Sequence, residues 1–580
     1  MKILLAYLKK YKKLCFVVLI LAVVNQTFSL LDPLIFRHII DDYATKFDSF
    51  TLGEFFRGVL FLLALAVGAA FVSRVAKNFQ DYFLNTITQR LGAKIYTDGV
   101  EHSLALPYEV FEDKRSGETL GVLQKVRSTS EVFITSFINI FFVSLIGFTF
   151  VTIYAISIYW GVAVVFALTV PIIGTLSYVL TGKVKNIQKI ILAETTALAG
   201  STTESLRNIE LVKSLGLVDQ EIGRLNSTTD KILKLELKKL RYIRSISFVQ
   251  GTLINLMRTL ILAFLLYLVF TRVVTFGEFF SLYIYSFFIF GPLQELGSAI
   301  NNYRDSEVAL AQFKEIMNTP VEPEPLAPQK MEMISELKFD NVSFQYKSAE
   351  SEALENITFQ AKAGETIAFV GPSGSGKTSL VKLLVGLYEP KSGVVSYNNI
   401  SSRDVSMNEL RSQFGFVTQD TQLFAGSIRE NLLFVNPNAT EEECLDAMEK
   451  SAATSLLNRA SNGLDTVIGE GGVKVSGGEK QRLSIARALL RKPAILIFDE
   501  ATSSLDSITE EEITSTIRDV SSGIKRITVL IAHRLSTIMH ADRIYVLEKG
   551  KIAETGTHEK LIEEKGLYYA MWRQQIGERI

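Results

Sequence analysis

One stretch of this 580-residue chain limits its possible folds more than any other, because residues 132–182 contain no Asp, Glu, Lys or Arg. These 51 residues would form a helix of about 76 Å, much longer than the roughly 30 Å hydrocarbon core of a bilayer. Two spans joined by a tight turn near Ile156–Trp160, where interfacial aromatic residues gather, fit this length. The alternative, buried core helices of a soluble protein, is disfavoured by the length of the run.

Further apolar runs bring the number of predicted membrane spans to six. The first predicted span follows a basic start but is long and has no signal-cleavage site after it, so we expect it to be retained. The 61 basic and 61 acidic residues balance, which gives no charge argument for a nucleic-acid partner. The predicted spans cover approximately residues 14–31, 58–84, 132–155, 159–182, 246–271 and 277–300.

The charges in the loops predict the orientation of the spans. Five lysines and no acidic residue precede the first span, whereas the loop after it is acidic. By the positive-inside rule, we expect a multi-pass protein of the cell inner (cytoplasmic) membrane with both termini in the cytoplasm. The two long inside segments have helical patterns, so the spans should continue as rods that turn at Leu106–Glu109 and Ser214–Gly216.

A proline-rich stretch marks a domain boundary, since four of the twelve prolines lie between residues 318 and 336. Such a composition suits an extended linker. After it, short β-branched segments alternate with amphipathic segments, which predicts an α/β domain with a largely parallel sheet. We therefore expect an all-α transmembrane domain over residues 1–318, a linker over 319–335 and a second domain over 336–580.

The second domain carries the sequence GPSGSGKT between an expected strand at residues 366–370 and an expected helix at 379–387. This is the P-loop pattern in its strand–loop–helix setting, where glycines let backbone N–H groups surround phosphates. Lys377 is expected to reach the outer phosphates of ATP, and the Thr378 hydroxyl to ligate Mg²⁺. The predicted nucleotide-binding residues here are Gly371, Pro372, Ser373, Gly374, Ser375, Gly376, Lys377, Thr378 and Ser379.

A second buried strand is expected at residues 494–498, directly before Asp499 and Glu500. An acid at the end of such a strand suits a Mg²⁺ ligand, and its neighbour suits a group that orients the attacking water. The sequence therefore predicts an α/β P-loop NTPase domain in which Asp499 binds the metal and Glu500 is catalytic.

Six motifs follow one another along the second domain: GPSGSGKT, VTQD (417–420), VSGGEKQR (475–482), ILIFDE (495–500), SSLD (503–506) and AHR (532–534). In this order they resemble ATP-binding cassette (ABC) proteins. With six spans fused ahead of them, they resemble an exporter-type half-transporter of the multidrug or lipid A flippase-like subgroup, over essentially the whole chain. Residues 106–118 and 204–216 are similar to the two coupling loops of that family.

The resemblance implies roles for single residues. Tyr346 is similar to the aromatic residue that stacks on adenine, and Gln419 to the glutamine that contacts Mg²⁺. Asp506 resembles the acid between the two ATP sites, and His533 the switch histidine that contacts the γ-phosphate. The expected catalytic residues are thus Glu500, His533 and Gln419, and the expected Mg²⁺ ligands are Thr378, Gln419 and Asp499.

Residues Ser476, Gly477, Gly478 and Glu479 resemble the signature motif that closes over ATP bound to the other subunit. Val475 replaces the usual Leu, which is a packing change. Glu479 replaces the usual Gln and adds a negative charge, which we expect to lower affinity or activity while the Ser-Gly-Gly donors remain. One P-loop and one signature per chain imply a domain-swapped-type dimer with a second half-transporter, either a second copy or a different half.

The resemblance also implies a function, namely ATP-driven export or flipping of a hydrophobic or amphipathic drug or lipid by alternating access. An importer on the exporter fold and an ATP-gated channel or regulator remain alternatives. Charges within spans are costly, so Arg74, Lys77, Arg258 and Glu295 are candidate cavity residues. Either they pair (Lys77 with Asp81, Arg74 or Arg258 with Glu295), or the basic ones partly line a cavity for an anionic amphipathic molecule.

Overall fold

The computed structural model describes residues 1–580 except 114–115, 420, 460, 470–471, 501–506, 522–524, 533 and 577–580. It forms two compact units. The first unit holds residues 1–106 and 113–321, and the second holds residues 107–112 and 322–580. The short segment 107–112 thus belongs to the second unit, although the chain on both sides of it belongs to the first.

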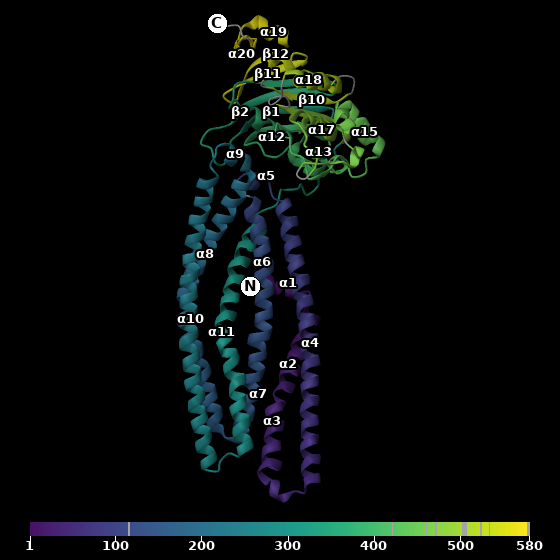
Figure 1. The fold of residues 1–580 in the computed structure, drawn as a ribbon. Coiled ribbons are helices and arrows are strands. Elements are labelled where there is room, and N and C mark those ends of the chain that lie inside the picture. Colours follow the sequence, from purple (N-terminus) through teal and green to yellow (C-terminus); the bar gives the residue numbers. More distant parts are fainter. Residues whose placement is uncertain are drawn as a thin grey trace. The chain divides into compact units, whose positions relative to one another are not determined.

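The first unit is built from helices, several of which are far longer than a bilayer is thick (Figure 1). The helices α4 and α10 each run without interruption for 53 residues, or about 80 Å, so the predicted rods are present. The helices are α1 (Lys2–Lys9), α2 (Lys12–Ser29), α3 (Leu31–His38), α4 (Leu52–Leu104), α6 (Ser116–Ser136), α7 (Val143–Ile158), α8 (Trp160–Arg207), α9 (Ile209–Ser214), α10 (Val218–Phe270) and α11 (Phe276–Asn318), with single turns η1 (Ile39–Tyr43), η2 (Ala44–Ser49) and η3 (Phe137–Phe142).

Five helical stretches among the described residues are long and apolar enough to cross a membrane: Lys12–Ser49, Leu52–Leu104, Thr119–Ile158, Val218–Phe270 and Phe276–Asn318. A shorter apolar helical stretch, Trp160–Leu176, lies where the fourth span is predicted. The turn between the third and fourth predicted spans falls at Tyr159, whose backbone is extended between Ile158 and Trp160. The charge-free run therefore folds as two helices, as its length requires.

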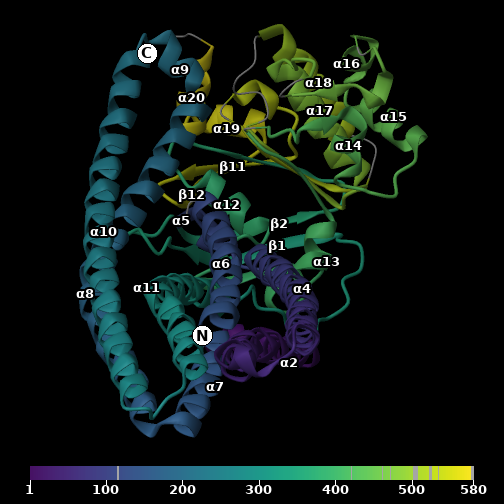
Figure 2. The ribbon, with the colours of Figure 1, turned by 60° about the horizontal axis from the view of Figure 1, so that its bottom comes forward.

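Two sets of contacts organise this unit. Helix α2 packs along α4, while α8 pairs with α10 along its length (Figure 2). Helix α11 contacts α4 of the first set and both α8 and α10 of the second, and thereby connects the two sets. The predicted cytoplasmic tips are turns, since α4 ends at Leu104 and α9 ends at Ser214, followed by Gly216 in a left-handed conformation.

The second unit contains two main sheets. A six-stranded sheet has the order β12-β11-β3-β10-β9-β6 and is parallel except for β12, and a four-stranded antiparallel sheet has the order β2-β1-β4-β5. A two-stranded sheet pairs β7 with β8. The strands are β1 (Glu336–Phe344), β2 (Leu354–Lys362), β3 (Thr366–Val370), β4 (Ser392–Tyr397), β5 (Ile400–Ser401), β6 (Phe414–Val417), β7 (Gly426–Ser427), β8 (Val467–Ile468), β9 (Ile495–Asp499), β10 (Ile527–Ile531), β11 (Arg543–Glu548) and β12 (Lys551–Gly556).

Helices surround these sheets. The helix that follows the P-loop, α12, packs in a core shared by both main sheets, and a separate helical core is formed around α14–α17. The remaining helices are α5 (Tyr108–Asp113), α12 (Lys377–Leu384), α13 (Met407–Ser412), α14 (Ile428–Leu433), α15 (Glu441–Lys450), α16 (Thr454–Arg459), α17 (Gly477–Leu490), α18 (Ser507–Ser521), α19 (His558–Glu564) and α20 (Leu567–Gln575), with short turns η4 (Ser402–Asp404), η5 (Gly463–Asp465) and η6 (Leu535–Thr537).

The order of the parallel strands positions the candidate site. Strand β10 lies between β3 and β9 and is parallel to both, so the P-loop after β3 and the acids after β9 lie at the same edge of the sheet. The P-loop helix begins earlier than its predicted start at residue 379. It begins at Lys377, directly after the left-handed Gly376. Strand β1 ends at Phe344, because the chain turns at Tyr346, whose carbonyl oxygen accepts a hydrogen bond from the Ala349 N–H.

Candidate ATP site and the membrane unit

The phosphate-binding loop connects β3 to α12 and needs glycine for its shape. Gly371 has φ +156° and Gly376 has φ +102°. A Cβ at these positions would lie 2.1 Å from the Leu547 carbonyl oxygen and 2.7 Å from the Ala353 carbonyl oxygen, respectively. The loop can therefore fold tightly only with glycine there. This tight fold places it in front of the N-terminus of α12, the position where backbone N–H groups attract an anion.

Lys377 lies over this loop. Its Nζ donates hydrogen bonds to the Gly371 carbonyl oxygen at 2.9 Å and to the Pro372 carbonyl oxygen at 3.1 Å. Burial lowers the pKa of the Lys377 ammonium, and the carboxylates of Glu500 and Asp499 oppose that shift. The charges of Asp499 and Glu500 act on Lys377, so the structure brings the predicted phosphate-binding lysine close to one predicted metal ligand and to the predicted catalytic acid.

The acids after β9 differ in backbone and environment. Burial raises the pKa of Asp499 to about 6, with a further rise from Glu500, while Lys377 and Lys382 oppose it. Glu500 adopts φ 50°, a left-handed conformation that is strained for a residue with a side chain, and its N–H donates to the Ile531 carbonyl oxygen at 2.9 Å. Strain of this kind is typical of functional positions, where the surrounding fold fixes the side-chain direction.

Two buried polar atoms at this site have no hydrogen-bond partner in the described part of the chain. These atoms are the Ser375 Oγ in the P-loop and the Asp499 Oδ1 at the end of β9. Buried polar atoms almost always have hydrogen-bond partners in folded proteins, so two unpaired atoms at one site indicate room for a ligand. The hydroxyl can bind an anionic part of that ligand, and the carboxylate can bind a cationic part. Thr378 and Gln419, the other predicted metal ligands, are exposed.

Tyr346 lies against the P-loop helix, as an adenine-stacking residue would. Its hydroxyl shares a hydrogen bond of 3.0 Å with the Ser379 Oγ, and its ring is edge-on to Tyr388 at 5.5 Å. The Lys382 Nζ lies 5.5 Å, 5.7 Å and 5.6 Å from the ring centroids of Tyr108, Tyr346 and Tyr388, respectively. Sequence reasoning did not find Lys382, because no motif contains it and two of its three aromatic neighbours, Tyr108 and Tyr346, are distant in sequence.

The signature lies at the N-terminus of α17. Ser476 is the N-cap, and a capping box joins it to Glu479. Glu479 also forms an ion pair with Arg459 at 2.9 Å. Within the described residues, the side-chain hydrogen bonds of Ser476 and Glu479 stay among these three residues and do not reach the P-loop. Asp506 and His533, also predicted for this site, lie outside the described residues.

The two predicted coupling tips have different surroundings. In the first tip, Tyr108 packs edge-on against Tyr388 at 5.8 Å, and Glu109 forms an ion pair with Lys347 at 2.7 Å. In the second tip, Leu211 and Leu215 are 58% and 61% exposed. The second unit also holds a cavity of about 450 Å³, lined by aromatic and basic side chains that include Phe414, Phe416, Phe424, Phe434, Arg411 and Arg487.

The charges within the spans pair only in part as predicted. Lys77 donates to Asp81 at 2.9 Å and to Asn139 at 3.0 Å, so this predicted pair is present. The predicted pairing of Glu295 with Arg74 or Arg258 is wrong for the described residues, because the Arg258 guanidinium bonds Asn255 at 2.8 Å and lies 4.5 Å from the centroid of the Phe287 ring. The side chains of Arg74 and Glu295 are both exposed.

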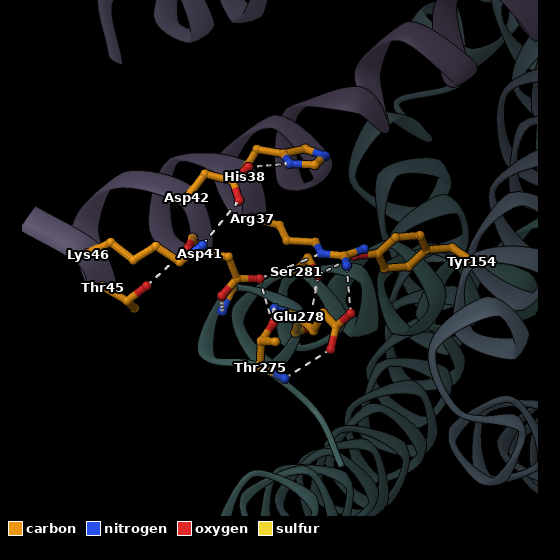
Figure 3. A network of polar contacts seen from close by, with 11 residues as sticks. Arg37, His38, Asp41, Asp42, Thr45, Lys46, Tyr154, Thr275, Glu278 and Ser281 are labelled. Atoms are coloured by element: carbon orange, nitrogen blue, oxygen red, sulfur yellow. Dashed lines mark hydrogen bonds and ion pairs between the residues drawn. The ribbon is translucent and has the colours of Figure 1, made fainter. Parts of the chain in front are cut away.

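A polar network that was not predicted from the sequence joins the first and sixth spans (Figure 3). It lies at the ends of these spans that the predicted topology places outside the cytoplasm. The Arg37 guanidinium donates to Glu278 at 2.6 Å and to the Tyr154 hydroxyl at 3.4 Å. Asp41 accepts a hydrogen bond from the Gly277 N–H at 2.8 Å. A Cβ at Gly277 would lie 2.5 Å from the Arg37 carbonyl oxygen, so the two helices approach too closely for any other residue.

Comparison with known proteins agrees with this arrangement. Residues 354–503 match the family described as ABC transporter, and residues 15–293 match the family described as ABC transporter transmembrane region. The chain is 32% identical to an ATM1-type heavy metal exporter of Novosphingobium aromaticivorans over 92% of this chain and 89% of the relative. It is 31% identical to a multidrug resistance ABC transporter ATP-binding and permease protein of Lactococcus lactis subsp. cremoris over 89% and 87%.

Among solved structures, the chain is similar to a bacterial Atm1-family ABC exporter with ATP bound. The TM-score is 0.88 and the sequence identity is 27%, over 97% of this chain and 98% of the other. The similarity therefore extends over both units, and each unit matches the corresponding part of an exporter.

Proposed function

This chain belongs to the ABC transporter family, whose members are ATPases coupled to transport, and from that premise we propose that it exports hydrophobic or amphipathic molecules across the cytoplasmic membrane. It is a multi-pass membrane protein with an ATP-binding unit in the same chain. In the proposed topology that unit lies in the cytoplasm. ATP binding closes two such units together and turns an inward-facing cavity outward, and hydrolysis of ATP reopens it.

One observation carries the proposal, namely the two orphaned polar atoms beside Lys377. A bound nucleotide would offer phosphate oxygens to the Ser375 Oγ and Lys377, and Mg²⁺ would be held by Thr378, Gln419 and Asp499. Mg²⁺ held by these residues would supply positive charge that stabilises the negative charge of the phosphates. Glu500, fixed by its strained backbone, orients the attacking water.

The signature supports a dimer. Ser476, Gly477 and Gly478 bind ATP in the family only when they face the P-loop of another subunit, and in this chain the described hydrogen bonds of Ser476 and Glu479 stay local. A second copy of the chain supplies the missing half of each site, and a homodimer then has two complete sites.

The two coupling tips transmit closure to the spans. In the first tip, Tyr108 and Glu109 belong to the second unit and pack within it against Tyr388 and Lys347. The second tip presents Leu211 and Leu215 to solvent, and exposed leucines at a helix tip suit an apolar groove. We assign them to the cavity lined by Phe414, Phe416 and neighbouring aromatic residues in the partner subunit.

The cargo is amphipathic in this proposal because the candidate cavity combines basic and aromatic side chains. Arg258 stacks on Phe287, and Arg74 is exposed, so both present positive charge beside apolar surface. Lys77 is already paired with Asp81 and contributes less. An anionic group of the cargo would interact with Arg74 and Arg258, while the apolar part of the cargo would pack against the aromatic rings.

Stimulation of ATPase activity tests this cargo chemistry. The purified protein is assayed with anionic and neutral amphiphiles of equal chain length, as unmodified protein, as Arg74→Ala with Arg258→Ala, and as Lys77→Ala. We expect the double variant to lose stimulation by the anionic compound only, and the single variant to lose less. Equal stimulation by both compounds in all three proteins would contradict the anionic preference.

Transport into inverted membrane vesicles tests the function itself and separates the alternatives. With a panel of fluorescent lipids and hydrophobic dyes, an exporter produces ATP-dependent accumulation inside the vesicles. An importer produces ATP-dependent depletion, and a channel or regulator produces neither. Vesicles that contain the Glu500→Gln variant are the control, and accumulation in them equal to that of the unmodified protein would contradict ATP-driven export.

A further inference from the structure

Glu479, the acidic residue in the signature, is held by three hydrogen bonds that meet on a single oxygen. Its Oε2 accepts the Ser476 N–H at 2.8 Å, the Ser476 hydroxyl at 2.9 Å and the Arg459 Nη2 at 2.9 Å. The Glu479 N–H in turn donates to the Ser476 Oγ at 3.3 Å. The single hydroxyl proton of Ser476 is therefore committed to the Glu479 carboxylate.

This arrangement conflicts with the role proposed for Ser476. A serine that binds the γ-phosphate of ATP must donate its hydroxyl proton to that phosphate, and a hydroxyl has only one proton to donate. A carboxylate is a strong acceptor that retains the proton, and its negative charge also repels the incoming phosphate. On its own, Glu479 would therefore weaken the signature, as the sequence predicted.

Arg459 counteracts both effects. It is the last residue of α16, and its Nη2 donates to the Lys474 carbonyl oxygen at 3.1 Å as well as to Glu479. The side chain of Glu479 is only 11% exposed, whereas that of Arg459 is 53% exposed. The guanidinium thus neutralises a largely buried carboxylate from the solvent side and shares the oxygen that holds the Ser476 proton.

The pKa of Glu479 agrees with this geometry. Burial alone would raise it, but the hydrogen bonds from Ser476 and the charge of Arg459 hold it below its ordinary value. Glu479 therefore stays ionised and needs a positive partner at neutral pH.

We propose that Arg459 is a positioning residue of the ATP site, which neutralises Glu479 so that the Ser476 hydroxyl is released to the γ-phosphate when two chains close. This inference rests on the proposed function, in which the signature of one chain binds ATP held by the other. The pair Arg459–Glu479 then replaces the neutral glutamine that is usual at this position. Arg459 acts on ATP through Glu479 and Ser476 and does not touch the nucleotide.

The experiment is a double-mutant cycle on the full-length dimer, with the KM for ATP and kcat measured separately. We expect Arg459→Ala to raise the KM for ATP about fivefold, because closure then brings an unneutralised carboxylate to the phosphate, and to change kcat less. In a Glu479→Gln background the same Arg459→Ala change should have almost no effect on KM. Arg459→Lys should recover part of the loss, since it restores the charge.

Arg429→Ala is the matched control, because Arg429 also pairs with two acids of this unit, Asp465 and Glu441, and lies outside the signature contacts. Its KM for ATP should equal that of the unmodified protein. An equal rise of KM from Arg459→Ala in both backgrounds would overturn the proposal, since Arg459 would then act through the Lys474 carbonyl or the fold. No rise in either background would overturn it as well.

A separate variant distinguishes failure of this inference from failure of the proposed function. Ser476→Ala removes the hydroxyl that the proposal releases to ATP, and it should raise the KM for ATP both in the otherwise unmodified protein and in the Glu479→Gln background. If Ser476→Ala leaves the KM unchanged, the shared ATP site itself is wrong. If Ser476→Ala raises the KM and Arg459→Ala does not, only the role of Arg459 is wrong.

Discussion

The P-loop and the signature belong to the same unit, yet they differ in what a single chain provides for them. Around the P-loop, the Ser375 Oγ and the Asp499 Oδ1 are buried without partners in the described chain, so the site is built around a group that is still to be bound. In the signature, Ser476 and Glu479 hydrogen-bond each other, and Arg459 completes the set. The P-loop region has polar atoms that a ligand can pair, whereas the signature residues already form hydrogen bonds with one another.

This difference indicates that ATP binding has different free-energy requirements at the P-loop and at the signature. Binding at the P-loop pairs polar atoms that folding left unpaired, so it is favourable for one chain alone. Binding at the signature must replace a hydrogen bond that the chain already makes, so it depends on the second chain and on how firmly Glu479 retains Ser476. The chain is therefore expected to bind ATP as a single unit and to hydrolyse it only as a pair.

The role assigned to the P-loop region would be wrong if the Glu500→Gln variant kept its ATPase activity. We expect this variant to bind Mg-ATP and to hydrolyse it at least about a hundredfold more slowly, because the water is no longer oriented by a carboxylate. It should also accumulate as a closed, ATP-bound dimer. Steady-state ATPase rates and the retention of radiolabelled ATP after gel filtration measure both effects, and near-normal turnover would contradict the assignment.

Tyr346 tests the P-loop region separately, because its ring is predicted to increase the affinity for ATP without any contribution from the signature. We expect Tyr346→Ala to raise the Kd for ATP about threefold to tenfold through loss of ring stacking. Tyr346→Phe keeps the ring and loses only the hydrogen bond to Ser379, so it should bind ATP almost normally. Equilibrium binding of a fluorescent ATP analogue checks both variants, and equal losses would show that the hydroxyl matters instead of the ring.

Tyr108 tests whether closure reaches the spans. Its ring contacts Tyr388 and lies near Lys382, so Tyr108→Ser should uncouple cargo from ATP turnover. We expect cargo-stimulated ATPase activity to fall about fivefold while basal activity changes little, since one edge-on aromatic contact is worth about 1 kcal/mol. Tyr108→Phe is the control and should retain stimulation. An equal fall of basal and stimulated activity would indicate misfolding.

The smallest effect is expected in the first unit, in the network of Arg37. Arg37→Ala leaves Glu278 without its 2.6 Å partner, which should lower stability by about 1 kcal/mol because both side chains are partly exposed. The apparent melting temperature in detergent should fall by a few degrees, and ATP affinity should not change. Arg37→Lys should recover part of the loss. A change in ATP affinity would contradict the separation between these regions.

Sequence reasoning succeeded where neighbouring residues determine the structure. The P-loop, the strand over residues 366–370 and the turn at Tyr159 depend on local backbone preferences and on the length of one apolar run. The pair Lys77–Asp81 was predictable for the same reason, because residues four apart on a helix are neighbours. The capping box of the signature was not predicted, although Ser476 and Glu479 have the spacing of such a box.

The rest depends on contacts between elements that are distant in sequence. The pairing of Glu295 with a basic residue, one of two alternatives, is absent among the described residues, where Arg258 hydrogen-bonds Asn255 of its own helix and lies over the Phe287 ring of α11. Neither Lys382 among three tyrosines nor Arg459 beside Glu479 belongs to a motif, and only the fold brings these residues together. Charge balance at Glu479 was the one available signal, because a buried acid needs a positive partner.

The most direct test of the shared ATP site uses two defective chains with different affinity tags. Lys377→Ala disables the P-loop, and Ser476→Glu disables the signature, so each homodimer should hydrolyse ATP at near-background rates. In a mixed dimer purified through both tags, the P-loop of the Ser476→Glu chain faces the intact signature of the Lys377→Ala chain, which restores one complete site. We predict an ATPase rate at least about tenfold above either parent. A mixed dimer as inactive as its parents would contradict an ATP site formed by two chains.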